Sequence, residues 1–207
     1  MFVAALTGNF GMGKSSVASL FRACGAWTLD SDAIVAGLLN KKAVIEKIIT
    51  LLGPEVLDSN QRLNKSVVAD IIFKNKTSRK KIETLLHPLV FRAMEAAIKK
   101  IKKNYPMVIV EVPLLFEGKF QKRFNRTITV YTNQRTALAR LKKAGVSRKD
   151  ALARLHAQMD IRQKKRLADY VIDNNGTRQQ ANAQVRKVYK SLLVDKESML
   201  SMGLRRF

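Results

Sequence analysis

Short apolar runs alternate along the chain with longer segments of helical periodicity. The apolar runs occupy residues 2–7, 26–29, 107–112, 127–131 and 168–173. Short, nearly continuous apolar runs are typical of strands buried on both faces of a parallel sheet. The segments between them repeat apolar residues every three or four positions, as amphipathic helices do. This alternation predicts an α/β fold with a mainly parallel sheet flanked by helices.

The stretch from residue 33 to about residue 103 is mostly helical in pattern. Helices are predicted over residues 65–73 and 77–86, and His87-Pro88 is expected to interrupt the second of them. So much helix exceeds what a single crossover between adjacent strands requires. We therefore expect a helical insertion that grips a second substrate, within a chain that otherwise forms one domain over residues 1–207.

The most specific pattern joins the first apolar run to the first helical segment. Residues 8–15 read Gly-Asn-Phe-Gly-Met-Gly-Lys-Ser, which is the pattern of a phosphate-binding loop. Its glycines, Gly8, Gly11 and Gly13, permit positive φ angles and a close approach of phosphate to main-chain N–H groups. The helix that opens at Lys14 directs its positive end at the same anion. Lys14 is expected to reach the outer phosphates, and the Ser15 hydroxyl is expected to ligate Mg²⁺.

Two carboxylates, Asp30 and Asp32, follow the second apolar run. Ligands of open α/β sheets bind at the carboxyl ends of the strands, so these side chains are candidates for metal coordination or for activation of a hydroxyl nucleophile. We predict Asp32 as the general base and Asp30 as the metal ligand, with Asp30 as the alternative candidate for the base. The alternative, that one of them merely caps the helix beginning near Ala33, stays open.

Two basic helices are predicted over residues 133–144 and 147–166, joined by a turn at Gly145. Their position late in a phosphate-loop chain favours a mobile lid over about residues 133–166, closing over a triphosphate. A solvated helical hairpin is the alternative. The turn at residues 174–177 could border the base of a nucleotide. A closing helix is predicted over residues 178–193, and the tail beyond Val194 is expected to fray.

Composition narrows the class of protein. The 207 residues carry a net charge of +23, which attracts polyanions of any kind. The basic residues are spread along the chain and form no long tract interleaved with aromatics, so specific nucleic-acid binding is disfavoured. No apolar stretch approaches the roughly 18 residues that a membrane span needs. The only cysteine, Cys24, cannot form an internal disulfide, and cytoplasm is the simplest compartment.

The chain lacks the acidic Walker B pattern of motor ATPases, which favours a small-molecule kinase over a motor or a switch GTPase. From the first predicted strand to the closing helix, the chain resembles the dephospho-coenzyme A kinase family. The segments that carry this resemblance are Leu6–Ser15, Leu29–Asp32, Leu86–Val90, Val112–Glu117, Gln158 with Arg162, and Ala168–Gly176.

The resemblance implies a P-loop nucleotide-kinase fold and ATP-dependent phosphorylation of the ribose 3′-hydroxyl of dephospho-CoA, with Mg²⁺. By matching position, Asp32 would activate the hydroxyl, Arg140 would be the lid arginine, and the helical insertion would hold the acceptor. The implied nucleotide-binding residues are Gly8, Gly11, Met12, Gly13, Lys14, Ser15, Ser16, Asn174, Asn175 and Gly176. ATP and dephospho-CoA are thus the expected partners. We expect no specific nucleic-acid partner and no membrane span, and we expect the protein to be a monomer or a weak oligomer.

Three departures from the family pattern stand out. The loop carries Asn9-Phe10 and Met12 where small or aliphatic residues and serine are usual, and Ser31 replaces a usual alanine. Lys142-Lys143 follow Arg140 where a second arginine is common, and a lysine cannot reproduce a bidentate arginine contact. The rival interpretations are another small-molecule kinase, acting on a nucleoside monophosphate or on shikimate, and a nucleic-acid-binding ATPase suggested by the charge.

Overall fold

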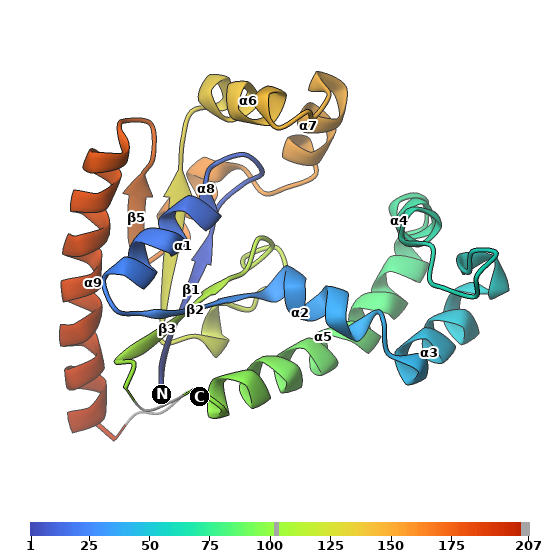
Figure 1. The fold of residues 1–207 in the computed structure, drawn as a ribbon, viewed down its shortest axis with the longest axis horizontal. Helices are drawn as coiled ribbons and strands as arrows, with labels where there is room; N and C mark the ends of the chain where they lie inside the picture. Colours follow the sequence, from blue (N-terminus) through green and yellow to red (C-terminus); the bar gives the residue numbers. More distant parts are fainter. Residues whose placement is uncertain (102–103, 204–207) are drawn as a thin grey trace. The chain divides into compact units, whose positions relative to one another are not determined.

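The computed structural model describes residues 1–101 and 104–203. The chain divides into two compact units, one formed by Met1–Asp30 with Ile101–Phe207 and the other by Ser31–Lys100. The first unit holds a five-stranded parallel sheet in the order β2-β3-β1-β4-β5 (Figure 1). The predicted parallel α/β architecture is confirmed, and the strands are β1 (Phe2–Thr7), β2 (Trp27–Asp30), β3 (Met107–Glu111), β4 (Arg126–Tyr131) and β5 (Tyr170–Asp173).

The α-helices of the first unit are α1 (Lys14–Ala23), α6 (Gln134–Lys143), α7 (Arg148–His156), α8 (Ile161–Leu167) and α9 (Arg178–Ser201), with a short 3₁₀ turn, η2 (Gln121–Arg123). The second unit contains α2 (Ser31–Leu38), α3 (Lys42–Leu52), η1 (Pro54–Val56), α4 (Lys65–Lys74) and α5 (Lys76–Lys99). None of the helices in the described ranges is both long and apolar enough to cross a membrane.

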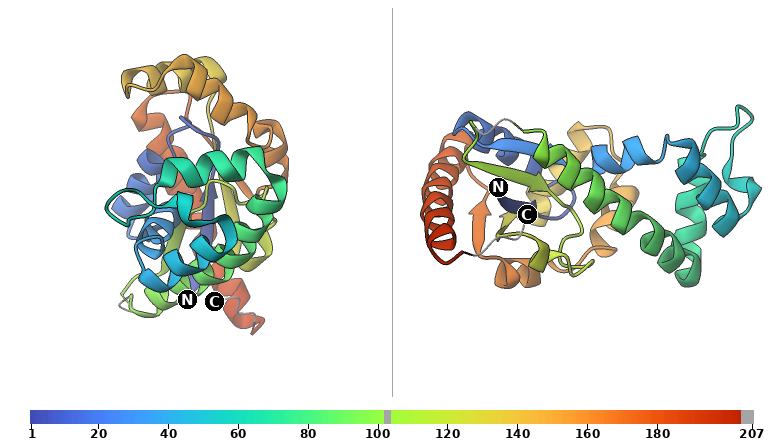
Figure 2. Two further views of the ribbon diagram at one scale, coloured as in Figure 1. Left: turned by 90° about the vertical axis from the view of Figure 1, so that its right-hand side faces the viewer. Right: turned by 90° about the horizontal axis from the view of Figure 1, so that it is seen from below.

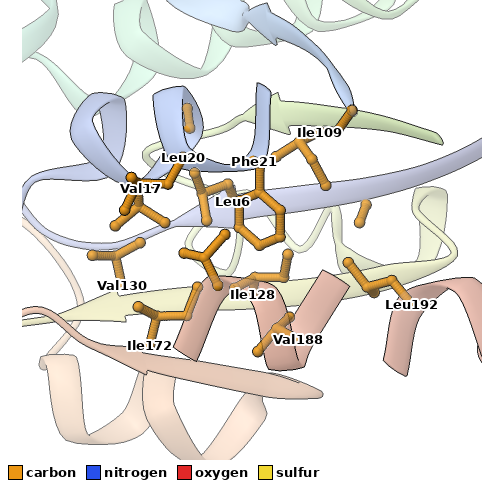
Figure 3. Packing of buried hydrophobic residues seen from close by; sticks show 14 of the residues in the cluster. Leu6, Val17, Leu20, Phe21, Ile109, Ile128, Val130, Ile172, Val188 and Leu192 are labelled. Atoms are coloured by element: carbon orange, nitrogen blue, oxygen red, sulfur yellow. The ribbon is translucent and has the colours of Figure 1, made fainter. Parts of the chain in front are cut away.

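The main hydrophobic core lies between the sheet and the pair α1 and α9 (Figure 3). Every residue of β1 is buried, and alternation sends Phe2, Ala4 and Leu6 into this core. Phe21 of α1 is fully buried among them. The opposite face of the sheet is covered in part by α8 (Figure 2), where the Thr129 hydroxyl donates a hydrogen bond to the Lys164 carbonyl at 3.2 Å. Burial of β1 on both faces explains its continuous apolar sequence.

Helix α9 extends further than predicted, because it is anchored at both ends. A Thr177–Gln180 capping box begins it. Near its end, Asp195 accepts two hydrogen bonds from Arg126, each of 3.0 Å, and one of 2.6 Å from the Tyr170 hydroxyl. The prediction that the chain frays beyond Val194 was therefore wrong as far as Ser201, where the helix ends. Residues 204–207 of the predicted tail lie outside the described residues.

Two further predictions about helix boundaries were wrong. Helix α5 runs through Pro88 without interruption. One buried stripe, Ile82, Phe91, Met94 and Ile98, spans both sides of the proline, and its burial outweighs the single main-chain hydrogen bond that proline removes. The basic segment predicted as one helix is two, α7 and α8.

The second unit has its own small core. Val44, Ile48 and Leu52 of α3 pack with Val56 and Ile82, and apolar residues of α4 pack against this cluster. The Asn64 and Asn75 side chains cap the first turns of α4 and α5. This unit is therefore a helical subdomain with apolar packing of its own, rather than a bare connection between strands.

Candidate active site

The loop between β1 and α1 has the backbone that phosphate binding requires. Gly8 has a φ of 148°, and a Cβ there would clash with the Val130 carbonyl of β4. Gly13 has a φ of 85° and immediately precedes α1 in the left-handed conformation. A Cβ at Gly13 would clash with the Asn174 side-chain amide and lie 3.3 Å from Arg140 Nη1. The loop thus turns from strand to helix at two positions that only glycine fits well.

Lys14 folds back over the loop from the first residue of α1. Its Nζ donates to the Gly8 carbonyl at 3.0 Å and to the Asn9 carbonyl at 3.4 Å. The ammonium group therefore lies beside the loop that precedes it, at the amino end of the helix. A cation and a helix N-terminus at one place form a site suited to an anion.

Ser15 meets a carboxylate that the sequence analysis did not select. Its hydroxyl donates to Glu111 Oε2 at 3.0 Å. Glu111 ends β3 and is the register partner of Asp30 at the end of β2. A hydroxyl and two carboxylates at the carboxyl edge of one sheet are oxygen donors of the kind that Mg²⁺ prefers. Among the described residues, no group of three or more His, Cys, Asp or Glu side chains is placed to hold a metal, so any ion here would also depend on the Ser15 hydroxyl and on other oxygens.

Arg140 reaches the loop from α6. Its Nη2 donates to the Asn174 carbonyl at 2.8 Å. Its Nη1 is buried and has no hydrogen-bond partner in the described structure, although it lies against Gly13. A buried guanidinium N–H without an acceptor is costly, and a phosphate oxygen at the loop would satisfy it. This atom is the structure's clearest indication of an anionic ligand.

The asparagine side chains of the turn after β5 hydrogen-bond to other parts of the protein. Asn174 is buried and donates from Nδ2 to the Met12 carbonyl at 2.9 Å. Asn175 Oδ1 accepts from the Thr132 hydroxyl at 2.9 Å and from the Asn133 main chain at 2.7 Å. The two asparagines therefore join the phosphate loop to the start of α6, while Gly176 and Thr177 of the turn are exposed.

A pocket of about 540 Å³ adjoins the loop beneath α7 and α8. Asn9 and Met12 of the loop line it together with Arg162 and Lys165 of α8. The Lys165 ammonium also lies 4.1 Å from the centre of the Tyr131 ring. Asp160 also lines the pocket, so the two cations leave a net positive charge on this wall next to the loop.

Asp32 lies in the other unit. It is the second residue of α2, whereas Asp30 ends β2, and both side chains are exposed. The helix begins at Ser31, two residues earlier than predicted. Asp32 therefore stands in the first turn of a helix, where a carboxylate is favoured by the helix dipole.

The family model described as Dephospho-CoA kinase matches residues 2–180. The chain belongs to the dephospho-CoA kinase family. The dephospho-CoA kinase of Aquifex aeolicus (strain VF5) is 35% identical over 191 residues, covering 92% of this chain and 97% of that protein. Among solved structures, TT1252 from Thermus thermophilus is 31% identical with a TM-score of 0.83, covering 92% and 96% of the two chains. A dephospho-CoA kinase from Campylobacter jejuni is 25% identical with a TM-score of 0.64, covering 95% and 98%.

Within this dephospho-CoA kinase family member, the structure brings together Gly13, Lys14, Arg140 and Asn174 at one loop. Sequence reasoning missed Glu111, although its signal resembled that of Asp30: a carboxylate at the end of a buried strand. It also gave no sign that Lys164, within the segment predicted as the lid, has a fully buried side chain.

Proposed function

We propose that this protein transfers the γ-phosphoryl group of ATP to the ribose 3′-hydroxyl of dephospho-CoA, yielding coenzyme A and ADP. The observation that carries the proposal is the family match from residue 2 to residue 180, which includes the loop where Arg140 Nη1 is buried without an acceptor. We assign the protein to the last step of coenzyme A synthesis, in the cytoplasm.

In this proposal the main-chain N–H groups from Gly11 to Ser16 and the Lys14 ammonium bind the ATP phosphates. Arg140 then places its positive charge where negative charge develops in the transition state, on the equatorial oxygens of the transferring phosphoryl group. Because its Nη2 is held by Asn174 and its Nη1 lies at Gly13, the guanidinium is oriented before the nucleotide arrives. A donor that needs no reorientation during the reaction stabilises the transition state most effectively.

Ser15, Glu111 and Asp30 are the residues that would hold Mg²⁺. The fit rests on their chemistry, since hard oxygen donors from one hydroxyl and two carboxylates match the preference of this ion. When bound, the ion would neutralise charge on the β- and γ-phosphates. The Ser15 hydroxyl donates to Glu111, which keeps both groups at the amino end of α1.

Asp32 is the proposed base for the acceptor hydroxyl. A ribose hydroxyl is a poor nucleophile, and a carboxylate within hydrogen-bond reach aligns it and takes its proton as the new bond forms. The helical insertion predicted over about residues 33–103 is proposed to bind dephospho-CoA; the structure describes Ser31–Lys100 as one compact unit. Residues 133–166 are proposed to form the lid, and Arg140 of this segment already contacts the loop in the present conformation. The exposed part of the turn at Gly176 is proposed to border the adenine.

The proposal is tested by ADP release with several acceptors. Purified protein with Mg-ATP is offered dephospho-CoA, AMP, shikimate or duplex DNA in separate assays. We expect dephospho-CoA alone to stimulate ADP release above the acceptor-free rate. Equal or greater stimulation by AMP or shikimate would favour another small-molecule kinase, and stimulation by DNA alone would favour a nucleic-acid-binding ATPase.

A further inference from the structure

A buried ion pair lies next to the phosphate loop but outside the groups assigned to binding or chemistry. Lys164 of α8 has a fully buried side chain, and its Nζ lies 2.8 Å from Glu117 Oε1. The Glu117 side chain is 22% exposed. Burial lowers the pKa of the Lys164 ammonium, and the hydrogen bond to Glu117 and its negative charge oppose that shift. Because desolvation makes such pairs costly, an apolar pair of similar volume often stabilises a fold equally well.

One contact of the pair leads to the base of the phosphate loop. Lys164 Nζ also donates to the Pro113 carbonyl at 3.0 Å. The same carbonyl accepts from the Thr7 hydroxyl at 3.1 Å, and Thr7 is the last residue of β1 before Gly8. A single carbonyl oxygen therefore joins the ammonium group to the point where the chain leaves the sheet.

A second set of contacts leads to the tip of the loop. Glu117 Oε1 accepts from the Met159 main-chain N–H at 2.9 Å. The Met159 carbonyl accepts from Asn9 Nδ2 at 3.0 Å. The neighbouring Gln158 Oε1 accepts from the Phe10 main-chain N–H at 2.8 Å. The short segment between α7 and α8 is thus held by Glu117 on one side and grips Asn9 and Phe10 on the other.

We propose that Glu117 and Lys164 form a positioning pair that fixes residues 7–10 in the shape that binds nucleotide phosphates. This inference rests on the proposed function, because it takes the loop to bind ATP. Neither side chain is assigned contact with the reacting atoms. The pair acts through the Pro113 carbonyl at the base of the loop and through Gln158 and Met159 at its tip.

An apolar pair could not do the same. The ion pair begins two chains of directional hydrogen bonds, and these end at opposite sides of the same segment, residues 7–10. Lys164→Met would remove the hydrogen bond to the Pro113 carbonyl and leave the Glu117 charge without its partner. Loss of the Glu117 charge would instead weaken the hold on Met159 and leave the Lys164 ammonium buried without a counter-ion. In metal sites, a residue that contacts a ligand-binding residue rather than the ligand typically contributes 10- to 100-fold in affinity, and we expect an effect of that size here.

The experiment measures Mg-ADP affinity by titration calorimetry, which does not require the acceptor. The variants are Lys164→Met and the milder Glu117→Gln. The matched control is Asp195→Asn, which disrupts the Arg126–Asp195 ion pair at the other end of the same sheet. We expect the first two to weaken Mg-ADP binding by about tenfold or more. Asp195→Asn should lower the melting temperature while leaving that affinity unchanged.

Hydrogen exchange at the Phe10 amide supplies a second readout. Its protection should fall in Lys164→Met and Glu117→Gln but not in Asp195→Asn. Unchanged affinity in both loop-side variants, or an equal loss in the control, would overturn the proposal, as would failure of both variants to fold. If the unmodified protein binds Mg-ADP but does not phosphorylate dephospho-CoA, the proposed function fails while the affinities still decide this inference. If it binds no Mg-ADP, both fail.

Discussion

Replacing Arg140 with alanine should separate catalysis from nucleotide binding. In the structure Arg140 Nη2 donates to the Asn174 carbonyl, while Nη1 is buried at the loop without an acceptor. Loss of one preorganised donor to developing charge typically costs about 10²- to 10³-fold in turnover. We therefore expect Arg140→Ala to lower kcat by about that factor, with a much smaller change in the dissociation constant of ATP. Loss of the charged hydrogen bond to Asn174 should also cost roughly 1.5–3 kcal/mol of stability.

The assay is initial-rate turnover at saturating Mg-ATP and dephospho-CoA, with ATP affinity and melting temperature measured on the same preparations. Arg135→Ala is the matched control, because Arg135 is an exposed arginine of the same helix that lines the groove between α6 and α7. It should retain nearly full turnover. If kcat of Arg140→Ala stays within about threefold of the unmodified protein while the melting temperature falls, Arg140 only stabilises the fold through Asn174. That result would refute its proposed role in stabilising the transition state.

Three further predictions address the base, the pH response and the charge. Asp32→Asn should lower turnover by roughly 10²- to 10⁴-fold at saturating Mg-ATP, the range for a general base; near-normal activity in it, with nearly complete loss in Asp30→Asn, would show that the wrong carboxylate was chosen. Burial, together with the hydrogen bond to Asp195 and its charge, raises the pKa of Tyr170 from 10.0 to about 12. The unfolded chain therefore releases this proton before the folded one, so the free energy of unfolding should decline as pH rises from about 10 to about 12. Denaturant titrations should show a smaller decline in Tyr170→Phe, and an identical decline would contradict the argument. Duplex DNA should bind only non-specifically, with Kd on the order of 10⁻⁴ to 10⁻⁶ M at physiological salt and weaker as salt rises; a salt-resistant, sequence-preferring complex of nanomolar affinity would contradict this.

The features predicted well from the sequence are those encoded locally. The loop from Gly8 to Ser15 was predictable because its glycines and its place between a strand and a helix follow from backbone conformation alone. The parallel sheet followed from runs buried on both faces. The start of the second basic helix also has a local signal, because Ser147 caps α7 by accepting from the Asp150 N–H at 3.1 Å.

The features missed depend on partners far away in sequence. Asp195 is a polar residue in a basic tail until β4 and β5 supply Arg126 and Tyr170. In the sequence Lys164 is indistinguishable from the basic residues Lys165 and Arg166 that follow it, until Glu117, from a loop 47 residues earlier, is placed beside it. The break between α7 and α8 did have a local signal in Asp160, which caps α8 by accepting from the Arg162 N–H at 2.7 Å.

The central claim is that the acceptor is the ribose 3′-hydroxyl of dephospho-CoA. The most direct measurement is phosphorus NMR with mass spectrometry of the product formed from Mg-ATP and dephospho-CoA. The account predicts one added phosphate, carried as a monoester at the 3′ position, with stoichiometric ADP. A product without a 3′-phosphate, together with efficient phosphorylation of a nucleoside monophosphate under the same conditions, would contradict it.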